Sequence, residues 1–247
     1  MKKTSNILVL SLLTMASLQA ATVFTPLNLI GGPSGTISTT SFTTSSGATF
    51  DINVTLSATS TTTTVDVTDP ANPITTVLPN VVSDIAINGN GIIGVASAGD
   101  PNFGNNLTID GDDEEQLIIS DLSISNFVAG SGGLTVADIT NLQFSSLSFF
   151  NGTAANDGVA ISTTAFDINS LAGTTIITQP TDVDLSAVTG IATSDVIFIQ
   201  SDTLQSNNRV SLSDVTVSFD DPSVVPEPSS TALIALGACG FLIRRKR

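Results

Sequence analysis

The chain has 247 residues, with seven Lys and Arg against 22 Asp and Glu and no His, so its net charge is −15. A chain this acidic lacks the clustered cations that bind nucleic-acid phosphates, and no nucleic-acid partner is expected. A hydrophobic content of 41% is too high for a disordered acidic polymer. Ser and Thr account for 65 residues. This content of hydroxyl groups is unusually high, but it does not indicate a particular activity.

The cations lie almost entirely at the two ends of the chain. Lys2 and Lys3 stand at the start, four more close the sequence, and only Arg209 lies between. Residues 21–225 hold 21 carboxylates and that single cation, a net side-chain charge of −20. The charge pattern therefore predicts three parts: residues 1–20, a body over residues 21–225, and a tail over residues 226–247.

The first part has the layout of a secretory signal peptide. A basic head is followed by an apolar run over residues 7–15 and by residues 16–21, which have small side chains where a signal peptidase needs them. The run is too short for a membrane span, which needs roughly 20 residues. We expect a signal helix that is cleaved after Ala20, with the general secretion machinery and signal peptidase as partners. The alternative is a buried N-terminal helix.

The tail also has three parts in a fixed order. They are Pro226, Glu227 and Pro228, then an apolar stretch over residues 231–243, then the basic end formed by Arg244, Arg245, Lys246 and Arg247. As a helix the apolar stretch rises about 20 Å, against a hydrocarbon core of roughly 30 Å. Flanking serines and snorkelling arginines would extend it to a short transmembrane helix, with the basic end in the cytoplasm.

This tail resembles the PEP-CTERM sorting signal of exopolysaccharide-producing Gram-negative bacteria, over about 22 residues of the 247. The resemblance implies that the precursor is held in the inner membrane until an exosortase, a cysteine-type membrane transpeptidase-like enzyme, cuts near the tripeptide. The product would then reach the cell surface or the extracellular matrix. Pro226, Glu227 and Pro228 would be a processing site and not a catalytic one. The alternative is a plain tail anchor that is never cut.

The body shows a strand pattern. Apolar side chains alternate with polar ones, and turn-forming clusters of Gly, Pro, Asn and Asp divide the runs. The alternating residues are Phe50, Ile52, Val54 and Leu56, then Val65 and Val67, Ile85 and Ile87, Val159 and Ile161, and Val196 and Phe198. About 11 to 13 short strands with frequent turns indicate an all-β fold, a single antiparallel β-sandwich of jelly-roll type.

Three segments of the body shift their apolar parity by one residue. They are Leu117, Ile119, Leu122 and Ile124; Leu142, Phe144, Leu147 and Phe149; and Val210, Leu212, Val215 and Val217. A shift of one residue turns side chains to the other face of a strand unless a bulge absorbs it. We expect bulges or bends near Ser120-Asp121, Ser145-Ser146 and Ser213-Asp214. The alternative is two short strands joined by a tight turn.

The chemistry of the body is defined by what it lacks. Residues 21–225 contain no His, Cys, Lys, Tyr or Trp. Catalytic triads, thiol nucleophiles, lysine Schiff bases and histidine-ligated zinc are therefore excluded. The two glutamates, Glu114 and Glu115, are adjacent and would point to opposite faces of a strand. We expect no enzyme activity; a carboxylate-only glycoside hydrolase is the alternative that composition leaves open.

The densest acidic segment precedes the expected strand that starts at Gln116. Asp110, Asp112, Asp113 and Glu115 could supply oxygens to a structural calcium ion. Their spacing does not fit an EF-hand, and the alternative is a solvated turn. A solvated turn is also expected for Asp220 and Asp221, before the tail. Calcium would be the sole cofactor.

These features predict an exported, exosortase-processed structural or interaction protein. We expect it at the cell surface or in the matrix, associated with exopolysaccharide and without catalysis. The alternative is a calcium-dependent carbohydrate-binding module.

A body with a net charge of −20 repels itself, and counterions relieve that repulsion. We expect the midpoint of thermal unfolding to rise with added sodium chloride or millimolar calcium, measured against samples containing chelator. Identical midpoints in all three conditions would contradict this expectation.

Overall fold

The computed structural model describes the larger part of the body. The described residues are 20–66, 74–87, 90–96, 109–110, 115–150, 158–166, 175–178, 180–188, 190–191, 193–201 and 209–222. The expected signal segment before Ala20 and the tail over residues 226–247 lie outside these ranges. No helix within the described ranges has the length and apolar character needed to cross a membrane.

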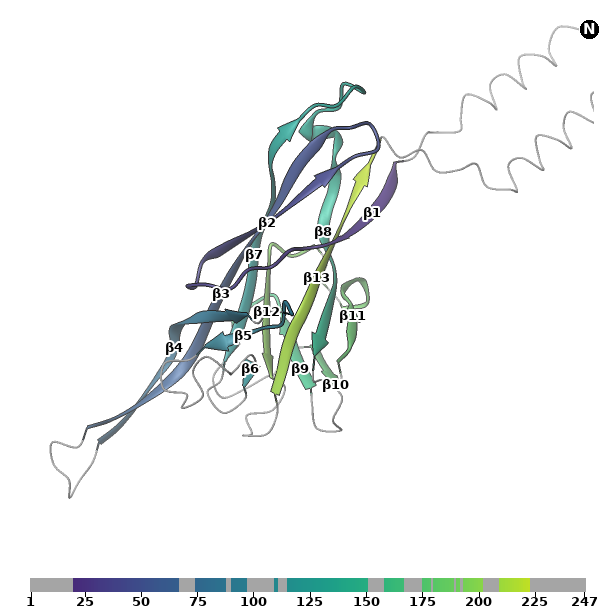
Figure 1. Cartoon of the computed structure of the whole chain (residues 1–247). Coiled ribbons are helices and arrows are strands. Elements are labelled where there is room, and N and C mark those ends of the chain that lie inside the picture. Colours follow the sequence, from purple (N-terminus) through teal and green to yellow (C-terminus); the bar gives the residue numbers. More distant parts are fainter. Residues whose placement is uncertain are drawn as a thin grey trace, which may run out of the picture.

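The described residues form an antiparallel all-β structure (Figure 1), as the alternating pattern predicted. The strands are β1 (Ala21–Pro26), β2 (Thr36–Thr43), β3 (Thr49–Asp66), β4 (Ile74–Ile87), β5 (Ile93–Ala96), β6 (Ile109–Asp110), β7 (Gln116–Val128), β8 (Thr140–Phe150), β9 (Gly158–Ser162), β10 (Thr175–Thr178), β11 (Asp182–Asp184), β12 (Val196–Ser201) and β13 (Arg209–Asp221). Two short 3-10 helices, η1 (Val136–Asp138) and η2 (Leu185–Ala187), precede β8 and follow β11.

The strands form one continuous hydrogen-bonded path in the order β10-β9-β12-β7-β3-β4-β5-β13-β8-β11. Strand β4 joins two sections of this path, because Ile74 to Ser83 pair with β3 and Asp84 to Ile87 pair with β5. We call the part from β10 to β3, with β2 beside β3, the first section. The part from β5 to β11, with β1 beside β13, is the second section.

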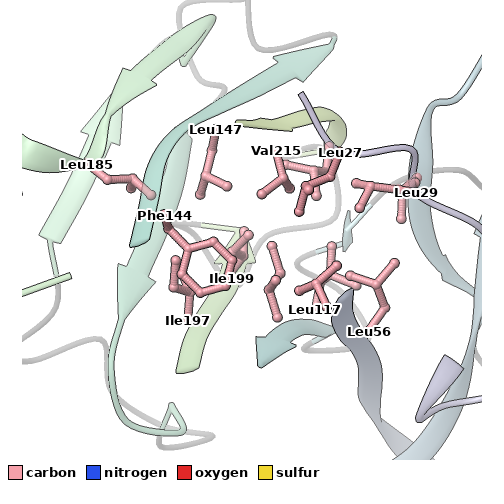
Figure 2. Close-up of a cluster of buried hydrophobic side chains, with 14 of the residues drawn as sticks. Leu27, Leu29, Leu56, Leu117, Phe144, Leu147, Leu185, Ile197, Ile199 and Val215 are labelled. Atoms are coloured by element: carbon pink, nitrogen blue, oxygen red, sulfur yellow. The ribbon is translucent and has the colours of Figure 1, made fainter. Parts of the chain in front are cut away.

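Both sections contribute to one hydrophobic core. Figure 2 shows side chains of β3, β7 and β12 meeting those of β8 and β13. The labelled residues from these strands are Leu56, Leu117, Ile197, Ile199, Phe144, Leu147 and Val215, and all seven are fully buried. Burial of apolar surface is the main favourable term in folding, so contact between the two sections stabilises the body.

A cluster of phenylalanines joins the two sections at one end of the core. The ring of Phe50 on β3 lies edge-on to the ring of Phe219 on β13, with centroids 5.5 Å apart. Phe42 on β2 packs against Phe219 at 4.9 Å, and Phe127 on β7 stacks on Phe50 at 6.2 Å. Such tilted and offset pairs add to the stabilisation that burial provides.

All three predicted bulges are present, and the strands run continuously through them. Ser213 is an extra residue in β13, because Leu212 pairs with Phe149 while Asp214 pairs with Ser148. In the same way, β8 has an extra residue at Ser145. Strand β7 has one between Ser120 and Ser123. The apolar residues on both sides of each bulge face the core, which is the physical reason for the parity shift.

Three more irregularities carry no parity signal in the sequence. They lie at Asn80 in β4, Asn126 in β7 and Asn141 in β8, where the register with the partner strand shifts. These three residues and Asp121 have φ between 50° and 56°. Asn and Asp tolerate this left-handed conformation better than other non-glycine residues, so their type matches the backbone at each bulge.

The structure corrects three expectations. Several strands are long, with 18 residues in β3 and 14 in β4, because bulges and not turns absorb the parity changes. In β12 the core side chains are Ile197 and Ile199, not Val196 and Phe198. Asp221, expected in a solvated turn with Asp220, ends β13 and is fully buried. The jelly-roll type of sandwich stays a prediction.

Phe50→Ala removes the ring that links β2, β7 and β13. Because Phe50 is 1% exposed, we expect a loss of about 3–5 kcal/mol in the free energy of unfolding. Phe24→Ala is the matched control, since Phe24 is 64% exposed and its truncation leaves no cavity. Denaturant titration of both variants measures the difference, and equal losses would contradict the role given to the cluster.

Asp121→Val places a β-branched residue at φ 56° in the middle of β7. We expect a loss of about 1–2 kcal/mol of stability, because the left-handed conformation strains a residue with a branched Cβ. Asp121→Asn removes the same charge but tolerates the conformation, so it serves as the control. Equal stability of the two variants in urea unfolding would show that the bulge imposes no such constraint.

Candidate functional site

The described residues reach only part of the acidic segment predicted to bind calcium. Asp112 and Asp113 lie outside them, as do Pro226, Glu227 and Pro228 of the tail. Asp110 pairs with Arg209 in the β6–β13 ladder, and Glu115, just before β7, is fully buried. A solvated turn therefore does not describe Glu115. Within the described ranges no three His, Cys, Asp or Glu residues are grouped to hold a metal ion, and the calcium site stays a prediction.

A groove of about 280 Å³ lies on the second section of the sheet. Four elements line it: β1, β8 and β13 and the segment from the end of β11 into η2. The lining residues are Thr22, Phe24, Gln143, Phe144, Ser145, Ser146, Asp184, Ser186 and Ser218. Its volume lies just below the range of roughly 300–1,000 Å³ that is typical of small-ligand sites.

Strand register explains why these residues meet. Ser218 of β13 is paired with Phe24 of β1 on one side and with Gln143 of β8 on the other. One step along the same face, Ser146 of β8 is paired with Asp184 of β11. Directly opposed side chains on one face have Cβ atoms about 4.5–5.5 Å apart. The groove therefore consists of two neighbouring rows of side chains across the sheet.

The bulge in β8 shapes the floor of the groove. The extra residue Ser145 lets Phe144 and Leu147 both point into the core although they are three positions apart. Ser145 and Ser146 then both line the groove. A regular strand would place only one of two consecutive residues on this side.

Phe24 is the exposed aromatic residue among those that line the groove. Its side chain is 64% exposed, whereas Ser218, directly opposite on β13, is 2% exposed. Figure 1 shows β1 lying along the edge of β13. The side chain of Phe24 is therefore accessible to a ligand.

Two carboxylates that accept hydrogen bonds from neutral donors belong to this region: Asp184 lines the groove, and Asp220 is bonded to the lining residue Thr22. The Thr22 hydroxyl donates to Asp220 Oδ1 at 2.7 Å, and the Asn141 amide donates to Oδ2 at 2.6 Å. The hydroxyl and the backbone N–H of Ser186 donate to Asp184 Oδ1 at 2.6 and 2.9 Å. These two bonds lower the pKa of Asp184, so it stays ionised under mildly acidic conditions.

Several polar side chains of the groove make no hydrogen bond to another described residue. The Gln143 carboxamide and the hydroxyls of Ser145 and Ser146 have no hydrogen-bond partner among the described residues, and Asp184 Oδ2 receives no hydrogen bond there. The amide offers two donors and an acceptor, and each hydroxyl both donates and accepts. These groups are available to a ligand that is itself rich in donors and acceptors.

A further pair of carboxylates lies one row beyond the groove. Ser148 of β8 is paired with Asp214 on one side and with Asp182 on the other, and its hydroxyl donates to Asp182 Oδ1 at 2.6 Å. Burial raises the pKa of Asp214; hydrogen bonds from the Val215 backbone and Thr216 oppose this, and the charge of Asp182 adds a smaller increase. Four aspartates therefore surround this face of the sheet.

The groove was not among the predicted sites. Its residues come from strands that are far apart in the sequence, and nothing in the sequence shows that β1 pairs with β13 or β11 with β8. The parity shift at Ser145-Ser146 is the one local signal, and it predicted the bulge without the groove.

The comparisons with known proteins concern the tail. Residues 224–247 match the family model of the PEP-CTERM protein-sorting motif, as the tripeptide, the apolar stretch and the basic end predicted. The motif indicates an exported protein whose membrane-anchored precursor is processed by an exosortase. No curated protein and no solved structure is significantly similar to the chain.

Proposed function

We propose that this chain is a non-catalytic structural or interaction protein that an exosortase delivers to the cell surface or the extracellular matrix, where its body associates with exopolysaccharide. The observation that carries the proposal is the sorting motif at residues 224–247. The body would be a β-sandwich of jelly-roll type, in agreement with the antiparallel strands and the shared core of the two sections.

The two ends of the body support this assignment of the termini. Strand β1 begins at Ala21, the first residue after the expected signal cleavage, and Ala21 is paired with Asp221 at the end of β13. The two ends of the described body therefore lie side by side. The hairpin of β3 and β4 projects from the opposite end (Figure 1). A precursor anchored at one end would present the other to the medium.

The absence of catalysis rests on the side chains of the body. Residues 21–225 have no His, Cys, Lys, Tyr or Trp. Glu115 is fully buried, which keeps its carboxylate from a polymeric substrate. In addition, the pKa of Asp184 is lowered, whereas a general acid for glycoside hydrolysis needs a raised one.

One observation favours a second candidate, the carboxylate-only glycoside hydrolase. Asp214 has a raised pKa and lies on the same face as Asp182, two strands away, so a carboxyl group with a raised pKa and a second carboxyl group are present together. Release of reducing ends from the cell's own polysaccharide, lost in Asp214→Asn, would favour this candidate over the proposal. If the wild type releases no reducing ends, the result supports the non-catalytic function.

The processing step is tested by the intact mass of the protein recovered from cells. We expect the surface fraction to contain a chain cut after Ala20 and near the tripeptide, because the motif is the substrate of the exosortase. Glu227→Ala should accumulate in the membrane fraction with its tail attached. Ser229→Ala, just outside the tripeptide, is the control and should be processed normally.

If the wild type and Glu227→Ala both keep the tail in the membrane fraction, the protein is a permanently anchored one and the sorting proposal is wrong.

Association with polysaccharide is measured separately. Binding isotherms on the cell's own polysaccharide, with and without chelator, should be the same, and loss of binding in chelator would instead identify the calcium-dependent module.

A further inference from the structure

We infer that the groove between β1, β8 and the start of η2 binds a neutral sugar ring, with Phe24 as the stacking surface and Gln143 and Ser146 as the polar contacts. This deepens the proposed function and rests on it, because it names the site and the chemical class of ligand through which the body would meet a polysaccharide. In this groove an exposed aromatic ring lies beside polar side chains that have no hydrogen-bond partner among the described residues.

A pyranose ring has an apolar face of C–H groups and an equatorial rim of hydroxyls. Phe24 offers the matching apolar surface, since its ring is 64% exposed at the wall of the groove. Its backbone is fixed by antiparallel pairing with β13, so the ring is presented by a rigid element. Stacking on this ring would shelter apolar surface of both partners from water.

The rim of the sugar would meet groups of mixed donor and acceptor character. The Gln143 carboxamide can donate to one hydroxyl and accept from another, and the hydroxyl of Ser146 can do both. Asp184 Oδ2, which receives no hydrogen bond from the described residues, adds a charged acceptor on the opposite side. A ligand without hydroxyls would leave these groups dehydrated and unpaired, which disfavours binding.

The charge of the face selects against anionic ligands. Asp184 lines the groove, and Asp220 accepts a hydrogen bond from the lining residue Thr22. Asp182 and Asp214 lie one row beyond, and no Lys or Arg lies between residues 21 and 208 of the sequence. A phosphate, a sulfate or a uronic acid would find no cation and would be repelled. A neutral hexose carries no charge, so these aspartates do not repel it.

The size of the groove limits the ligand to one ring. A volume of about 280 Å³ accommodates a single hexose, not several consecutive residues of a chain. The site therefore fits the end of a neutral polysaccharide or a single-residue side branch. Weak binding per site is expected, because only one ring is covered.

The test measures sugar binding to the full chain by saturation-transfer NMR with glucose, galactose and mannose as probes. At least one neutral hexose should bind, and its glucuronate and 6-phosphate counterparts should not. Because the pKa of Asp184 is lowered and the carboxylate stays ionised, affinity should be constant between about pH 5 and pH 8.

Phe24→Ala and Gln143→Ala should each weaken hexose binding by about tenfold or more, while thermal unfolding stays close to that of the wild type. Phe24→Tyr keeps the ring and should retain binding. Phe150→Ala is the matched control, because Phe150 is 49% exposed on the same strand as Gln143 but does not line the groove.

Three results would overturn the inference: no hexose binds the wild type, an anionic sugar binds better than its neutral parent, or Phe24→Ala binds as well as Phe150→Ala. Sedimentation with the cell's own polysaccharide separates this failure from that of the proposed function. If Phe24→Ala still sediments with the polysaccharide, the association stands and the groove is not its site. If the wild type does not sediment at all, the polysaccharide association itself is wrong.

Discussion

The body must stabilise its carboxylates almost without cations. Between residues 21 and 225 a single Arg faces 21 carboxylates, so ion pairs can account for at most one or two of them. Hydroxyl and amide donors take the place of cations. Asp51 receives bonds from Ser41 at 2.6 Å and from Asn126 at 2.7 Å, and Asp138 from the hydroxyl and backbone of Thr135. These bonds lower the pKa values of both aspartates. The abundance of Ser and Thr thus has a structural role on the outer faces of the sheet.

A hydroxyl donor lowers the local energy of a carboxylate but does not cancel its charge. The repulsion within the body therefore remains, and burial of the core has to outweigh it. Contact between the two sections provides such burial, since the large side chains of Phe50, Phe144 and Phe219 are buried there. Among the aspartates with lowered pKa values, Asp138 and Asp184 are exposed and Asp51 is half-buried, so water screens their charges from one another.

The sequence predicts structure where apolar side chains mark it. The bulges at Ser145 and Ser213 were predictable because the flanking apolar residues must all reach the core. The irregularity at Asn80 was not, because no alternating apolar residues continue on both sides of it. In β12 four consecutive apolar residues fit either parity, so periodicity alone could not identify Ile197 and Ile199 as the core side. The order of the strands could not be predicted either. Alternation shows which face of a strand points toward the core, but it does not show which strand lies beside it.

The bulge in β8 determines both the packing of the core and the shape of the groove. The extra residue at Ser145 keeps Phe144 and Leu147 on the core side of β8, and the same irregularity turns two serines toward the groove. The groove needs a second element, because its apolar wall is Phe24 on β1, which starts at the expected signal cleavage site. Pairing of Ala21 with Asp221 places that wall at the end of the body where the tail departs. The residue that forms the wall is therefore fixed by the same strand pair that brings the two ends of the described body together.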